Sequence, residues 1–80
     1  MYQAIHISTM SYICSDYGRH RFTSLNYDFT KFQCLNKLVK VAREEFRGYN
    51  FSILKDGKKI GTLVSGIYTK VKVAKAVNPF

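Results

Sequence analysis

Residues 49–64, YNFSILKDGKKIGTLV, predict a β-hairpin and set the fold class. Asp56-Gly57 at its centre is typical of a two-residue type I′ turn, which needs a positive φ at both positions. Pairing the strands outward from this turn places Ile53 opposite Ile60, and alternate side chains fall on opposite faces. The face that can receive a helix contains Tyr49, Phe51, Ile53, Ile60 and Val64. The other, mixed face contains Asn50, Ser52, Leu54, Lys59 and Leu63.

The segment before this hairpin predicts an amphipathic helix over about residues 31–47. Thr30 and Gln33 have the spacing of a capping box, in which each side chain binds the backbone N–H of the other residue. Gly48 is typical of a residue that ends a helix, and Arg47 suits the negative end of the helix dipole. The apolar stripe recurs at helical spacing in Phe32, Leu35, Leu38, Val39, Ala42 and Phe46.

The remaining segments have strand and turn composition. Residues 2–14 are rich in β-branched and aromatic residues, and SDYG at 15–18 is typical of a turn. A returning strand is expected over 19–27, and a last strand over 67–77. Whether the first strand is continuous or broken near Met10 stays open at this point.

The expected order of elements is ββαβββ. One antiparallel sheet with a single helix packed on one face is the simplest two-layer arrangement of these elements, so the sequence predicts an α+β fold. Eighty residues leave no room for a second core, and we therefore expect a single domain over residues 1–80.

The charge is strongly basic. Lys and Arg total 13 against 5 Asp and Glu, a net charge of +8. Such a balance favours an anionic partner: nucleic acid, an acidic protein or a membrane surface. Two cysteines are too few for a disulfide scaffold, and neither a signal peptide nor a membrane-spanning run is recognisable. These features lead us to expect a cytoplasmic protein with reduced thiols.

The outward face of the helix is the first candidate surface. It carries cations at helical spacing, although the solvated side of any helix has a similar composition. An ordinary pair of Lys40 with Glu44 fits this simpler interpretation. The cations of this face are Lys37, Lys40, Arg43 and Arg47.

The second candidate surface is the back of the sheet. In YTKVKVAK (68–75) lysines nearly alternate with apolar residues, so Tyr68, Lys70 and Lys72 should point away from the core. Cations interleaved with aromatic rings suit single-stranded nucleic acid. The alternative is an edge strand that lysines protect from aggregation. The hairpin could add Lys59, Leu54 and Leu63 to this surface.

The third candidate is YGRHRF at residues 17–22, just after a turn. Arginine side chains bind phosphates in two-pronged fashion and stack on bases, so Arg19 and Arg21, with Tyr17 and His20 beside them, form a dense recognition cluster. The alternative is a solvated hairpin tip without a ligand.

Catalytic and metal chemistry are weakly indicated. His6 and His20 could form an acid–base pair for RNA cleavage, but no supporting motif accompanies them. Zinc binding by Cys14, Cys34 and the two histidines lacks the usual ligand spacing. We therefore expect no enzyme activity, no metal and no cofactor. Membrane binding is not expected either, because the apolar stripe of the helix is needed for the core.

In its small size, basic charge and single-domain organisation the chain resembles the small basic accessory proteins with which bacteriophages inhibit host defence or toxin enzymes. The resemblance concerns overall character, and no residue is assigned from it. It implies a regulatory or inhibitory role in the host cytoplasm, such as countering a ribonuclease toxin.

These observations predict a non-enzymatic module that binds RNA or single-stranded nucleic acid. The alternative is a protein-binding inhibitor or a homodimer that uses the same sheet face, with Leu54, Leu63 and Tyr68 as apolar anchors. The residues expected to contact nucleic acid are Tyr17, Arg19, His20, Arg21, Lys40, Arg43, Arg47, Lys59, Tyr68, Lys70 and Lys72.

Overall fold

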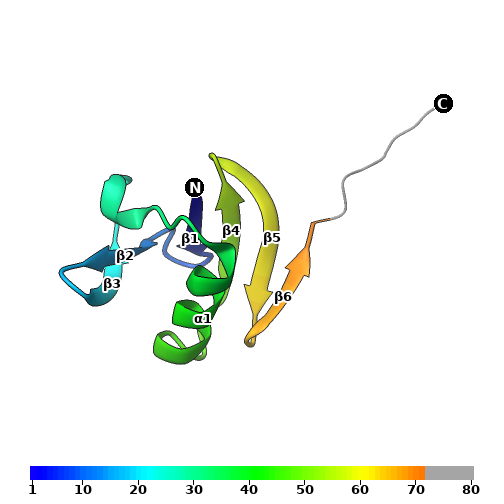
Figure 1. The fold of residues 1–80 in the computed structure, drawn as a ribbon. Helices are drawn as coiled ribbons and strands as arrows, with labels where there is room; N and C mark the ends of the chain where they lie inside the picture. Colours follow the sequence, from blue (N-terminus) through cyan, green and yellow to red (C-terminus); the bar gives the residue numbers. More distant parts are fainter. Residues whose placement is uncertain (72–80) are drawn as a thin grey trace.

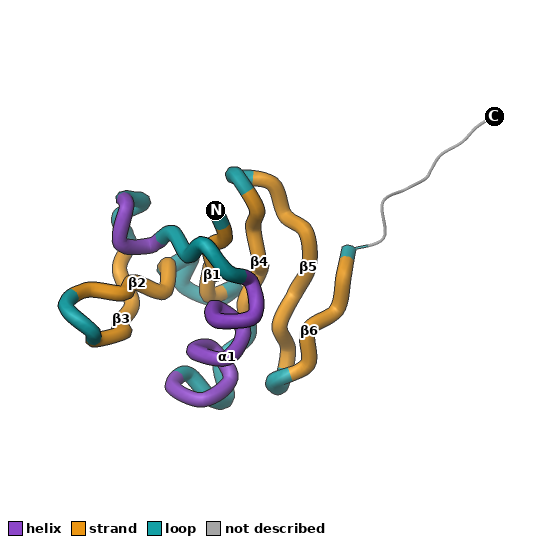
Figure 2. Tube along the Cα trace, viewed as in Figure 1, coloured by secondary structure: helices purple, strands orange, loops and turns teal. Residues whose placement is uncertain are grey.

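The computed structural model describes residues 1–71, which form one antiparallel sheet with a helix against one face (Figure 1). The strand order is β3-β2-β1-β4-β5-β6, so the first strand of the chain lies in the interior of the sheet. Figure 2 shows the short 3₁₀ helix η1 and the loop that lead from β3 to α1. This arrangement confirms the predicted α+β fold. The elements are β1 (Tyr2–His6), β2 (Tyr12–Asp16), β3 (Arg19–Thr23), η1 (Asp28–Thr30), α1 (Leu35–Glu45), β4 (Phe51–Lys55), β5 (Lys58–Val64) and β6 (Ile67–Lys70).

The strand expected over residues 2–14 is broken in two, so the described chain has six strands and not five. Backbone hydrogen bonds from His6 N–H to Ser11 O and from Met10 N–H to His6 O, both 2.7 Å, close a turn between β1 and β2. Met10 has a φ of 59°, outside the strand region. The chain therefore reverses here, and β1 pairs with β2 at Ile5 and Tyr12.

The helix α1 begins later than predicted. Phe32 forms an isolated bridge with Tyr2, in which each N–H donates to the carbonyl oxygen of the other at 2.7 Å. The Phe32 carbonyl oxygen would accept a hydrogen bond within a helix that began at residue 31, but it accepts one from Tyr2 instead. Thr30 is buried, and its hydroxyl donates to the Tyr27 carbonyl at 2.7 Å and accepts from Gln3 Nε2 at 2.8 Å. The predicted capping box at Thr30 is therefore wrong.

The turn of the β4–β5 hairpin is as predicted. Asp56 and Gly57 have φ values of 50° and 84°, and Lys55 pairs with Lys58. Both features are expected for a type I′ turn, whose twist matches that of the flanking strands. Pairs of positive φ values also occur between β2 and β3 and between β5 and β6, at Tyr17-Gly18 and Ser65-Gly66.

The register of the same hairpin differs from the prediction, because β5 contains a β-bulge. Ile53 pairs with Gly61 and not with Ile60, which is an extra residue on its strand. Since side chains alternate along a strand, one extra residue exchanges the two faces beyond it. Leu63 accordingly faces the helix and is 1% exposed, whereas Val64 is 43% exposed. The predicted faces are therefore wrong beyond residue 60.

The reversal of the two sheet faces that the bulge causes also affects β6. Leu63 pairs with Tyr68, and Gly61 pairs with Lys70. Directly opposed residues of an antiparallel ladder share a face, so Tyr68 and Lys70 lie on the helix side of the sheet. The prediction that they point away from the core is wrong. Lys72, predicted beside them, lies outside the described residues.

The core fills the space between α1 and the helix side of the sheet. Side chains of α1 meet strand residues there, and Phe32, which precedes α1, belongs to the same buried cluster. Tyr68 and Ile60 are partly buried and pack against the margin of this core. Its buried members are Ala4, Ile13, Phe32, Leu38, Val39, Val41, Ala42, Phe51, Ile53 and Leu63.

An ion pair ties the start of the chain to the β4–β5 turn. The Met1 ammonium lies 2.8 Å from Asp56 Oδ1, and this hydrogen bond lowers the pKa of Asp56 from its ordinary value of 3.8. A carboxyl whose folded pKa is lowered stabilises the fold above its unfolded pKa and loses that contribution as pH falls through the folded value. We expect Asp56→Asn, which retains a residue suited to the turn, to lose this part of the pH dependence below about pH 4.

The measurement is the melting temperature of both proteins between neutral pH and about pH 2. The difference in melting temperature between the two proteins should be largest at neutral pH and should become smaller as the pH falls toward about 2. A constant difference across the whole range would contradict a role for the ion pair.

Candidate nucleic-acid interface

Two hollows lie along the flank of α1 that faces β5 and β6. The first, the lysine hollow, has a volume of about 430 Å³. Its cations are Lys55 at the end of β4, Lys59 near the start of β5 and Lys70 at the end of β6. Tyr2 and Tyr68 supply aromatic surface. The apolar part of the lining is Leu35, Ile60 and Val71.

The lysine hollow combines positive charge with aromatic surface. Lys55 Nζ lies 5.8 Å from the centroid of the Tyr2 ring, within the range of a cation–π contact. Lys59 and Lys70 are exposed. No acidic residue of the described chain lines this hollow. An anion that enters it therefore meets ammonium groups without a competing carboxylate.

Tyr68 is held in the lysine hollow by its neighbour on β5. A Cβ atom added to Gly61 would lie 2.7 Å from Tyr68 Cε1 and 2.8 Å from its hydroxyl oxygen. The phenol ring thus occupies the space that a side chain at position 61 would need. Glycine within a strand often marks such a close approach. Gly61 is therefore the residue that lets the ring lie against β5.

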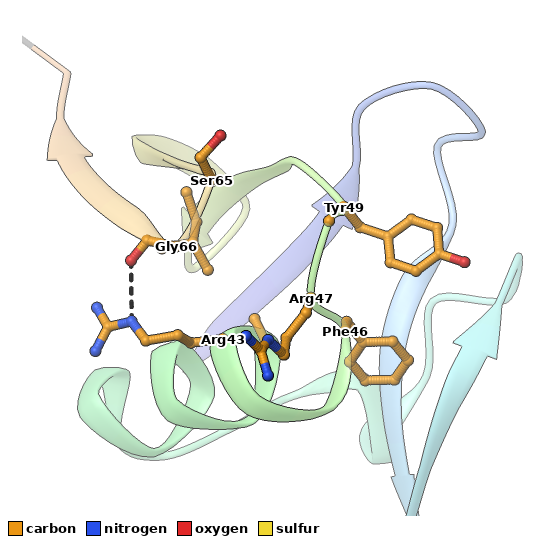
Figure 3. A pocket seen from close by; sticks show the side chains of 9 residues that line it. Arg43, Phe46, Arg47, Tyr49, Ser65 and Gly66 are labelled. Carbon is orange, nitrogen blue, oxygen red and sulfur yellow. Dashed lines mark hydrogen bonds between the residues drawn. The ribbon is translucent and has the colours of Figure 1, made fainter.

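The second hollow, the arginine hollow, lies beside the C-terminal end of α1 and has a volume of about 450 Å³ (Figure 3). Arg43 Nε donates to the Gly66 carbonyl oxygen at 2.9 Å, which joins α1 to the β5–β6 turn. This bond leaves the two terminal amino groups of the guanidinium for a further acceptor. Arg47, Phe46 and Tyr49 also line the hollow, and Figure 3 shows the two rings at the end away from Gly66.

The two hollows share no lining residue, but neighbouring residues of the β5–β6 ladder line them. Leu63 lines the arginine hollow, and its cross-strand partner Tyr68 lines the lysine hollow. Opposed side chains of an antiparallel pair are neighbours, with Cβ atoms about 5 Å apart. Together the hollows expose to one flank of α1 the cations Lys55, Lys59, Lys70, Arg43 and Arg47 and the rings of Tyr2, Tyr68, Phe46 and Tyr49.

Strand alternation divides the cluster predicted at residues 17–22. His20 faces α1, where its Nδ1 lies 2.8 Å from Glu45 Oε2. Arg21 lies on the opposite face, with Nη2 3.3 Å from Asp16 Oδ2. The prediction of one surface containing both residues is therefore wrong, and the His20 side chain joins β3 to the helix.

Arg21 belongs to a small polar network on the back of the sheet. Its Nη2 donates to the Tyr27 hydroxyl at 3.3 Å, and that hydroxyl lies 3.0 Å from Cys14 Sγ. The hydrogen bond to Asp16 raises the pKa of Arg21. The hydrogen bond with Cys14 raises the pKa of Tyr27. These contacts fix Arg21 and bury Cys14, which suits a structural role for both side chains.

Tyr17 and Arg19 remain at the tip of the β2–β3 hairpin. The Tyr17 side chain is almost fully exposed, at 94%. Together with Asp16 and Arg21 these two residues line a hollow of about 410 Å³. A carboxylate lies in this lining, so the hollow is less favourable for a phosphate than the two beside α1.

The other predicted contact residues are scattered. Lys40 is exposed on α1 but does not line either of the two hollows beside it. Leu54 is partly buried and Leu63 is fully buried. The prediction that Leu63 is an exposed anchor on the back of the sheet is therefore wrong.

The two histidines occupy different environments. His6 lies on β1, stacks on Phe22 with ring centroids 5.5 Å apart, and has its Nδ1 2.9 Å from Thr9 Oγ1. His20 lies on β3, with β2 between the two strands. Among residues 1–71 no group of three His, Cys, Asp or Glu side chains is placed to hold a metal ion. Their one α-helix is too short and too polar to cross a membrane.

Comparison of the chain with protein-family models, curated proteins and solved structures found no match. The fold and the site therefore define the protein in structural terms, as a small basic α+β domain with two cationic, aromatic hollows beside its helix.

Proposed function

We propose that this protein is a non-enzymatic module that binds RNA or another single-stranded nucleic acid along the flank of α1. The observation that carries the proposal is the pair of adjacent hollows, which are lined by five cations, four aromatic rings and, within the described chain, no acidic residue. Cations release counterions from phosphates, and exposed rings stack with unpaired bases. Each hollow is lined by both kinds of side chain.

The shape of the site favours a single strand over a duplex. A helix that reads duplex DNA lies in the major groove, whereas α1 is packed against the sheet through Leu38, Val39, Val41 and Ala42. The five cations of the two hollows do not lie together on the exposed side of α1, so this helix does not offer them to a major groove. In a duplex the bases are stacked on one another, and their faces are not available to Tyr68 or Tyr49.

The test is a titration of a labelled mixed-sequence RNA and of matching duplex DNA, followed by fluorescence anisotropy between about 50 and 200 mM salt. We expect the RNA to bind more tightly than the duplex. The double variant Lys55→Gln/Lys70→Gln should bind more weakly and should reduce the slope of log K against log salt by about 1.4, since each single-strand phosphate contact contributes about 0.7.

A matched control removes the same charge from the other flank of α1. Lys31 and Lys37 are exposed and line a hollow that also contains Asp28. We expect Lys31→Gln/Lys37→Gln to change the affinity much less than the variant in the lysine hollow. Equal losses for both variants would mean that the net charge acts as a whole, and the proposed site would be wrong.

The biological role that we propose is inhibition or regulation, in which occupation of a single strand denies it to another protein. The resemblance to small phage inhibitors supports this role. The rival surface for a protein partner is less well supported, because its three anchors do not form one patch: Leu63 is buried, and Tyr68 lies on the helix side of the sheet. Leu54 alone is left on the back.

A further inference from the structure

We infer that the lysine hollow and the arginine hollow act as two halves of one site, which a strand of about five nucleotides is needed to fill. This inference rests on the proposed function and specifies its ligand by length. It starts from the positions of the two hollows along α1. Leu35 lines the first and Phe46 lines the second, and at 1.5 Å per residue these positions are about 17 Å apart along the helix axis.

The rise per nucleotide gives the number of nucleotides that spans this separation. Stacked nucleotides rise by about 3.4 Å each, so a strand of about five reaches from one end of the flank to the other. A strand of two or three nucleotides occupies one hollow or the other. The cross-strand contact of Leu63 with Tyr68 makes the two hollows neighbours, and a bound strand therefore follows a short path between them.

The chemistry of the two halves differs. The lysine hollow is lined by Lys55 and Lys70 from the helix side of the sheet and by Lys59, which pairs with Leu54, and it suits phosphates. The arginine hollow lies beside the negative end of the helix dipole, which offsets part of the charge of Arg43 and Arg47. The exposed Tyr49 ring therefore contributes by stacking, the exposed Arg47 supplies a cation, and the Arg43 guanidinium is fixed by Gly66 for one directed contact. The Phe46 ring is packed against Phe22, with ring centroids 4.7 Å apart, and supports this end of the hollow.

Each half binds a strand only weakly by itself, because it is open and offers few contacts. Once a strand is held in one half, its other end is confined near the second half at an effective concentration in the millimolar range. Linked binding of this kind raises affinity by about 100-fold or more over either half. Affinity should therefore rise in a step when the strand becomes long enough to reach both halves.

The experiment is a competition series with oligouridylates from two to about ten nucleotides against a labelled ten-nucleotide strand, at one fixed salt concentration. For the unmodified protein we expect an increase of about 100-fold between strands of three and six nucleotides, followed by a much shallower rise. A gradual increase with length and no step would overturn the inference while leaving the proposed function intact. Failure of every strand to bind would instead reject the proposed function.

Variants in the two halves give a second test. In Arg47→Gln and in Lys55→Gln/Lys70→Gln the step should shrink or disappear, because a long strand then gains little from the damaged half. Among residues 1–71 the exposed Arg47 side chain forms no hydrogen bond or ion pair, so its loss should leave the fold intact; thermal melts check this. A full-sized step retained in both variants would overturn the inference.

Discussion

Leu63→Ala is expected to lower the free energy of unfolding by about 2 to 5 kcal/mol, because removal of a buried leucine side chain leaves a cavity. Leu63 is 1% exposed and belongs to the core beneath α1. The loss is a large part of the stability of so small a domain, which is on the order of 5 kcal/mol. Urea denaturation followed by circular dichroism measures it, and Leu63→Val is the milder variant if the alanine protein does not fold.

The neighbouring residue supplies the control. Val64 is 43% exposed, so we expect Val64→Ala to cost less than about 1 kcal/mol. A regular hairpin without the bulge at Ile60 predicts the opposite order, with Val64 inside and Leu63 outside. The comparison of two adjacent residues therefore tests the register, and a larger loss for Val64→Ala would show that the bulge is not present in solution.

Tyr68→Ala is expected to weaken binding of single-stranded RNA by about 1 to 3 kcal/mol, which is the usual cost of losing one base-stacking ring. This corresponds to about 5- to 150-fold in the dissociation constant. The ring lines the lysine hollow and is held against Gly61. Anisotropy with the same labelled RNA measures the change.

Tyr68→Phe is the matched control, because it keeps the ring and removes the hydroxyl. We expect it to bind within a few-fold of the unmodified protein. Tyr68 also packs against the margin of the core, so thermal melts of both variants are needed to separate weaker binding from unfolding. An equal loss of affinity in both variants would assign the effect to the hydroxyl and would reject stacking.

Short sequence patterns predicted the parts of this fold that depend on residues close together in the sequence. The centre of α1 follows from the apolar stripe, and the β4–β5 turn follows from Asp56-Gly57. The start of the helix does not, because Phe32 is bound by Tyr2, a residue distant in the sequence. A capping pattern at Thr30 cannot reveal that competing contact.

The bulge at Ile60 is the reason why the predicted site lay on the wrong face. Five of the residues predicted to contact nucleic acid line the two hollows beside α1, namely Lys59, Tyr68, Lys70, Arg43 and Arg47. The prediction placed Tyr68 and Lys70 on the back of the sheet because strict alternation was applied across the extra residue. An isolated glycine within a strand, Gly61, was the available sign of an irregularity.

Other members of the site had no recognisable pattern. Tyr2 and Lys55 are brought together by the pairing of β1 with β4. Phe46 packs against the core, as predicted, and also lines the arginine hollow, whereas Tyr49 had been predicted to face the helix and is exposed. Their common location depends on strand order, which the residue pattern does not specify. Strand order plays no part in the separation of His20 from Arg21, which follows from the alternation of side chains along β3.

The interior position of β1 has a consequence for how this chain folds. The β2–β3 and β4–β5–β6 segments are built from contacts between close neighbours in sequence and can form early. The sheet becomes continuous when β1 pairs with β4, whose residues leave the ribosome after most of the described chain. A nascent chain can pair β1 with the neighbouring β2 but leaves the β4-facing edge of β1 open during much of its synthesis, and closure of this long-range pair should limit the rate of folding.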